Sequence, residues 1–89
     1  MKKGDVVTVI TMAGEFVGKF DNSGGGTISL DDPRMLIQTQ QGMGFARGIC
    51  VTGEEDPTTV TFASYVFVTP TNKNIEKAYR QATSGIILQ

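Results

Sequence analysis

The most unusual combination of residue types in this chain lies in "DNSGGGTISLDD", residues 21–32. Three consecutive glycines, Gly24 to Gly26, stand between an aspartate and a short apolar run that ends in two more aspartates. Glycine-rich loops bind phosphate when a lysine follows the last glycine and a helix begins there. No lysine follows Gly26, and the residues after it favour a strand. The spacing therefore argues against a phosphate-binding loop.

A calcium loop is the second chemistry that this segment suggests. An EF-hand loop places oxygen ligands at fixed positions between two helices. Asp21 and Asp32 match its first and last positions, but Ser23 and Gly25 stand where two further ligands belong. With so few charged ligands and no flanking helices the affinity for calcium would be poor. We therefore expect no metal site.

Catalytic chemistry is equally poorly represented. The chain has no His and a single Cys, which excludes the usual serine and cysteine triads and most zinc sites. Cys50 lies between Ile49 and Val51, and this apolar setting predicts a buried structural thiol in a reducing cytosol. No acid–base pair is visible. We expect no catalytic residues, no cofactor and no enzymatic activity.

Length and charge limit the remaining possibilities. Eighty-nine residues allow one domain with a small core, so additional burial through self-association is expected. The net charge is −1, whereas proteins that bind nucleic acid usually carry a basic surplus. The short run Val6–Ile10 is interrupted by Thr8 and predicts neither a signal peptide nor a membrane span. We expect a cytoplasmic protein.

The hydrophobic pattern predicts short strands over most of the chain. A β-branched run over residues 6–11 and the alternation of Phe16, Gly18 and Phe20 predict a hairpin. A third strand begins at Thr27 and must bend, bulge or lie at an edge at Pro33. Gly42 and Gly44 then predict a turn. The run "TTVTFASYVFVT", residues 58–69, predicts the strongest strand, and its two apolar faces predict burial on both sides.

The period then changes to that of a helix. Ile75, Ala78, Tyr79 and Ala82 follow an i, i+3, i+4, i+7 spacing, and Thr71 or Asn72 can cap the helix. The apolar tail, residues 86–89, predicts docking on the barrel or on a neighbouring subunit. The predicted fold is mostly β: a small, strongly bent five-stranded barrel over residues 1–70, followed by one C-terminal helix in residues 71–89.

The first hairpin resembles a known family. "VTVITMAGEFVGKFDNSGGGTISLDD" is similar to the first motif of the Sm and Sm-like (LSm) proteins, with Gly14 at the turn, Gly18 in the second strand and Asp21 opening the loop that contacts RNA. Leu30 and the aspartates after it match the end of the third strand. Over most of its length the chain also resembles a group of small Sm-like proteins of marine cyanophages, through "GEFVGK", "DPRMLIQ" and "EKAYRQATSGI".

The second Sm motif can be placed in two ways. "ARGICV" offers Arg47 and Gly48 as the turn between the last two barrel strands. The topology favours the other placement, in which Ala63, Ser64 and Tyr65 form this turn. In the first loop, glycines stand where the family carries an aromatic residue or His for base stacking, and Thr27 stands at the position of its Asn.

The resemblance implies an Sm-like homo-oligomeric ring of roughly five to seven subunits that binds single-stranded RNA or DNA. In such a ring each loop residue is repeated around a pore, so three cations would form rings of charge. The residues expected to contact nucleic acid are Lys19, Asp21, Asn22, Thr27, Arg34, Arg47, Ser64 and Tyr65. The alternative is a structural or protein-binding phage ring in which these charges are solvated surface groups.

Overall fold

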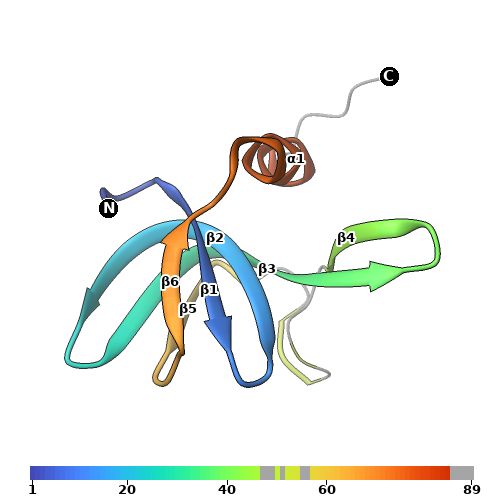
Figure 1. Ribbon diagram of the computed structural model, residues 1–89. Helices are drawn as coiled ribbons and strands as arrows, with labels where there is room; N and C mark the ends of the chain where they lie inside the picture. Colours follow the sequence, from blue (N-terminus) through green and yellow to red (C-terminus); the bar gives the residue numbers. More distant parts are fainter. Residues whose placement is uncertain (47–49, 51, 55–56, 85–89) are drawn as a thin grey trace.

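A computed structural model describes residues 1–46, 50, 52–54 and 57–84 of the chain. About half of its residues are in six strands, and one helix follows them (Figure 1). The elements are β1 (Val6–Thr11), β2 (Gly14–Gly24), β3 (Thr27–Thr39), β4 (Gly42–Ala46), β5 (Thr59–Phe62), β6 (Phe67–Pro70) and α1 (Lys73–Thr83). The prediction of a mostly β fold with a C-terminal helix is confirmed. Residues 86–89, for which docking was predicted, lie outside the described residues.

The strands form one antiparallel sheet with the order β4-β3-β2-β1-β6. β5 pairs with the first part of β3, over Ile28 to Asp31, and β4 pairs with its last part, over Met35 to Thr39. Both strands therefore lie along the same edge of β3. The sheet bends strongly, so that β5 and β6 lie near each other at its two ends, joined by residues 63–66 (Figure 1).

Two details of the predicted barrel were wrong. The sheet is open, because β5 and β6 do not pair with each other in the described part of the chain. It also has six strands, because β3 continues to Thr39 and returns as β4.

The predicted turn at Gly42 and Gly44 is instead formed by Gln40 and Gln41, and Gly42 begins β4 with a φ of 117°. The β3–β4 hairpin projects from the body as an arm (Figure 1).

β3 bends at Pro33, as the sequence predicts. Val17 of β2 pairs with Arg34, but Lys19 pairs with Asp31, so Asp32 and Pro33 together oppose the single residue Gly18. This is a β-bulge, which leaves one residue unpaired and increases the local twist. Asp32 has a φ of 51°, in the left-handed region that non-glycine residues rarely adopt. The bulge divides β3 into a part that carries β5 and a part that carries β4.

Side chains from the two faces of the sheet form two cores. Val7, Val9, Ile28 and Leu30 are fully buried on the inner face, where the bent sheet encloses them. On the outer face, Val6, Val17 and Tyr79 form the second core, with Ile75 and Phe45 packed against it. α1 contributes Tyr79 and Ile75, so the helix covers one end of the outer face. Both faces of β1 are therefore apolar at this end.

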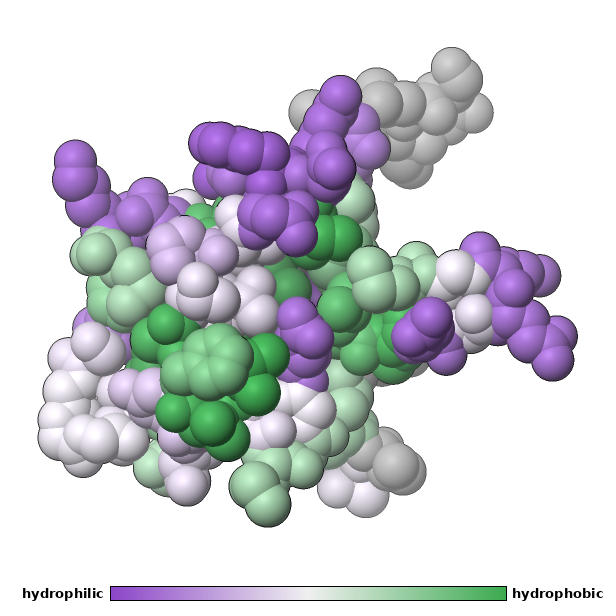
Figure 2. All heavy atoms as spheres, viewed as in Figure 1, coloured by the Kyte–Doolittle hydropathy of each residue, from purple (hydrophilic) through white to green (hydrophobic). Residues whose placement is uncertain are grey.

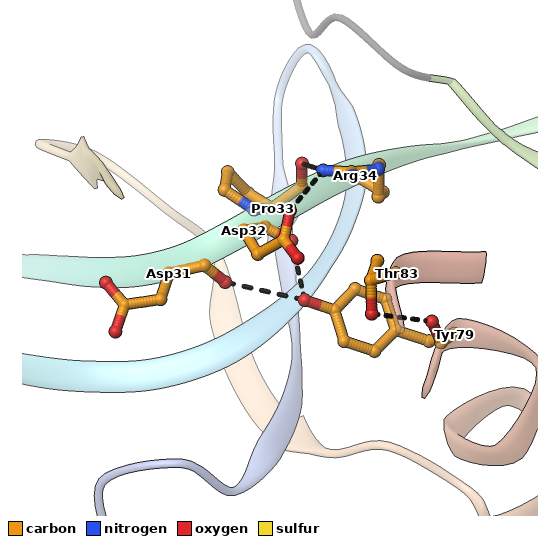
Figure 3. A network of polar contacts seen from close by, with 6 residues as sticks. All are labelled: Asp31, Asp32, Pro33, Arg34, Tyr79 and Thr83. Atoms are coloured by element: carbon orange, nitrogen blue, oxygen red, sulfur yellow. Dashed lines mark hydrogen bonds and ion pairs between the residues drawn. The ribbon is translucent and has the colours of Figure 1, made fainter. Parts of the chain in front are cut away.

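α1 begins and packs as its sequence predicts. The Asn72 side chain caps it by accepting a hydrogen bond from the Ile75 backbone N–H at 2.9 Å. Arg80 and Glu76 form the expected i, i+4 ion pair at 3.1 Å. The Tyr79 hydroxyl donates to the backbone carbonyl of Asp32 at 2.5 Å, in the bulge of β3 (Figure 3). The helix is thus anchored at the point where β3 bends.

Two burial predictions were wrong. The run of residues 58–69 is not one strand: it breaks at residues 63–66, and Val66 and Phe67 are exposed. On the inner face of β6, Val68 packs against the inner core. On the outer face, α1 covers only the end away from Phe67. Cys50 is exposed rather than buried, because β4 ends at Ala46 and Cys50 lies beyond the sheet.

A substitution at Gly18 tests the close packing of β2 against β3. A Cβ at this position would lie 3.0 Å from the Leu30 Cβ and 3.2 Å from the Asp31 backbone oxygen. We expect Gly18→Ala to lower the free energy of unfolding by about 1–3 kcal/mol through overpacking. Gly44→Ala is the matched control, because a Cβ at Gly44 meets nothing within 4 Å and its backbone suits other residues. Urea unfolding of both variants measures the difference, and equal stabilities would contradict the packing described here.

The ionisation of the buried Tyr79 hydroxyl should make the stability of the fold depend on pH. Burial raises the pKa of its hydroxyl to about 12. Because the folded pKa lies above the unfolded value of about 10, the protonated phenol stabilises the folded state below pH 10, and this contribution is lost as the pH rises to 12. We expect Tyr79→Phe to cost about 1 kcal/mol at neutral pH. Between pH 10 and 12 the wild type should lose stability faster than the variant in urea unfolding, and parallel losses would contradict the anchor.

Candidate nucleic-acid interface

Two turns lie side by side at one end of the bent sheet. Ile28 of β3 pairs with Phe62 of β5, so the β2–β3 turn and the turn of residues 63–66 leave the sheet next to each other. Tyr65 packs against the inner core that contains Ile28. This arrangement brings four of the predicted site residues to one end of the molecule, which we call the turn end. They are Asn22, Thr27, Ser64 and Tyr65.

The triple glycine gives the β2–β3 turn its shape. Gly25 and Gly26 have φ angles of 61° and 84°, which other residues rarely adopt. The Thr27 hydroxyl donates to the Gly24 carbonyl at 2.9 Å and closes the turn. A Cβ at any of the three glycines would meet nothing within 4 Å, so the backbone conformation requires glycine and packing does not. The turn is therefore exposed, uncharged and rich in accessible backbone groups.

Asp21 is occupied by an ion pair close to the turn end. Lys3 Nζ lies 2.9 Å from its carboxylate, which also accepts from the Asn22 side-chain amide at 2.6 Å. The hydrogen bond with Asp21 raises the pKa of Lys3, and the same hydrogen bond lowers the pKa of Asp21. The positive charge of Lys3 is therefore paired with a carboxylate in this structure.

The predicted cations do not gather at the turn end. Arg34 lies beyond the bulge, where it is buried and forms an ion pair with Asp32 at 2.6 Å (Figure 3). Lys19 lies in the middle of β2, in register with Asp31. Arg47, and with it the alternative turn at Arg47 and Gly48, lies outside the described residues. Ala63, Ser64 and Tyr65 do lie between two strands, as the preferred placement of the second motif predicts.

A pair of hydroxyl contacts along β5 was not predicted from the sequence. Thr61 and Ser29 share a hydrogen bond at 2.8 Å, and Thr59 donates to the Asp31 carboxylate at 2.7 Å. The alternation of threonines in "TVTF" was the available signal, because alternate residues of a strand lie on one face. Lys3 was not predicted either, because only the fold brings it to Asp21.

Other chemistry gains no support from the structure. Within the described residues, no group of three or more metal-ligating side chains lies close enough to hold an ion. In that same part of the chain, no helix has both the length and the apolar character needed to cross a membrane.

No protein-family model matches this chain, and no curated protein matches it either. The groups that the turn end offers for binding are uncharged hydrogen-bonding groups and one partly exposed aromatic ring, Tyr65.

Asp21 should limit the affinity of the turn end for polyanions. We expect Asp21→Asn to strengthen binding of labelled oligo-U or single-stranded DNA several-fold at low salt, because Lys3 is released from its ion pair. Glu15→Gln removes one negative charge from another part of the surface and is the matched control. Fluorescence anisotropy over a salt series measures both variants. An equal gain in both would show that only net charge matters, against a local role of Lys3.

Proposed function

We propose that this protein is an Sm-like homo-oligomeric ring protein that binds single-stranded RNA or DNA at its turn end. The ring places identical turn ends around one axis, so that weak contacts of each copy are repeated. A short, strongly bent sheet with β5 along one edge and β6 along the opposite edge supports such a ring.

One observation carries the proposal: β5 and β6 are free edges that carry no charged side chain. In the described part of the chain, β5 pairs only with β3, and β6 pairs only with β1. Natural proteins protect free edges with charged residues, but "TVTF" and "FVTP" contain none. Each edge is four residues long. Pairing β6 of one copy with β5 of the next would remove both of these edges, and closure into a ring would leave neither of them unpaired in any copy.

The turn end supports binding of nucleic acid by groups other than cations. Tyr65 offers an aromatic ring, and stacking of one base is worth about 1–3 kcal/mol. Asn22 and Ser64 offer exposed amide and hydroxyl groups at the same end of the molecule. With Lys3 paired and Arg34 buried, we expect a weaker salt dependence than that of a typical basic binding protein.

The same ion pairs favour a second candidate function. If the Lys3 and Arg34 charges stay neutralised by Asp21 and Asp32, the ring has little attraction for phosphate and would act as a structural or protein-binding component. The binding measurements separate the two functions. Detectable binding of oligo-U or single-stranded DNA at low salt supports the first candidate, and its absence in the assembled wild-type protein supports the second.

Edge pairing predicts a simple effect of charge. We expect Thr69→Lys, in the middle of the free edge of β6, to convert the assembled protein to a monomer, because a lysine disfavours strand addition. Gln40→Lys, at the exposed tip of the β3–β4 arm, adds the same charge and is the control. Size-exclusion chromatography with light scattering gives the masses. An unchanged mass of Thr69→Lys would show that β6 is not the contact.

A further inference from the structure

An apolar patch remains uncovered on the outer face of β1 and β6. Val68 points to the inner core, so its neighbour Phe67 faces outward, in register with Ile10. The Val66 N–H donates to the Ile10 carbonyl at 2.7 Å and holds Val66 next to them. Figure 2 shows apolar side chains gathered over β6 and β1 on this face. We call Ile10, Val66 and Phe67 the outer patch.

The exposure of this patch is unusual for an isolated chain. Phe67 is 51% exposed and Val66 is 59% exposed. Phe67 alone thus leaves about 100 Å² in water, since an aromatic side chain typically buries 150–250 Å². At the other end of this face, Tyr79 of α1 packs against Val6 of β1. Phe67 lies outside this cluster and stays exposed. A partner surface would remove the outer patch from water.

The charge next to the patch indicates the class of partner. Glu15 pairs with Ile10 in the β1–β2 ladder, so a carboxylate borders the patch on the side of β2. No cation pairs with Ile10 or Phe67 across the strands. A nucleic acid stacked on Phe67 would bring its phosphates toward this carboxylate, which is unfavourable. An uncharged protein surface fits better.

The chain itself contains such a surface. A hollow of about 410 Å³ lies between the β1–β2 turn and the end of β5, and none of its lining residues is charged. Phe16 and Phe62 form its floor, with ring centroids 5.0 Å apart. Met12, which is almost completely exposed, and Ala63 line it as well. The hollow is large enough for an aromatic side chain and lies beside the free edge of β5.

We infer that Phe67 of one copy docks in the Phe16–Phe62 hollow of a second copy. The inference rests on the proposed ring and identifies the side chain that fixes its register. Phe67 begins β6, and Phe62 ends β5. Antiparallel pairing of these two equally long edges brings the first residue of one to the last residue of the other. The pairing that removes the free edges therefore also brings the outer patch to the hollow.

The absence of tryptophan from the chain allows a direct test. Phe67→Trp places a single tryptophan in the patch, and Met43→Trp places one on the exposed β3–β4 arm as a control. We expect the emission of Phe67→Trp to shift to shorter wavelength as the concentration rises and light scattering detects assembly. Met43→Trp should keep the emission of a solvated indole. Adding Ala63→Glu to Phe67→Trp should abolish the shift, because a carboxylate then occupies the hollow.

The outcomes separate this inference from the ring itself. Assembly without a shift of the Phe67→Trp emission would overturn the docking and leave the ring intact. A shift that survives Ala63→Glu would overturn the hollow as the docking site. A shift that requires added oligo-U or single-stranded DNA would make Phe67 a base-stacking platform and overturn the protein contact. Absence of assembly at every concentration would overturn both proposals.

Discussion

The bulge of β3 at Asp32 and Pro33 is the constraint on which the rest of the structure depends. Two residues of β3 oppose the single residue Gly18 there, and Asp32 adopts a left-handed conformation. Such a conformation in a non-glycine residue persists only when its surroundings hold it. Here the Tyr79 hydroxyl binds the Asp32 carbonyl, and Arg34 binds the Asp32 carboxylate. The helix and the bend of the sheet therefore stabilise each other.

The bend determines which surfaces stay free. Before the bulge β3 carries β5, and after it β3 carries β4, so the β3–β4 arm leaves the body and does not close the sheet. β5 and β6 are left with free edges that carry no charged side chain. Because α1 is held at the bulge, it covers one end of the outer face and leaves Phe67 exposed at the other. One local feature thus accounts for both surfaces proposed for assembly.

The sequence predicts local features well and distant ones poorly. The helix follows from the spacing of Ile75 and Tyr79. Asn72 was one of two predicted caps, and a bulge was one of three outcomes predicted at Pro33, because each depends on neighbouring residues. The arm could not be predicted, since the Gln38–Gln41 tract has no apolar alternation that fixes where β3 ends. The two-sided burial expected around Phe67 failed because the sequence pattern does not say which end of a face α1 covers.

The same limit applies to the candidate site. Placing Ser64 and Tyr65 at a turn between two strands was possible from the family motif, but the Lys3–Asp21 pair was not, because only the fold joins these residues. Arg34 was expected at a pore because the family resemblance implies a ring, but it lies buried next to the bulge. Self-assembly through free strand edges is the central claim. Native mass spectrometry of the wild-type protein tests it most directly: the ring predicts one species of roughly five to seven chains, and a spectrum containing only the 9.6 kDa monomer would contradict it.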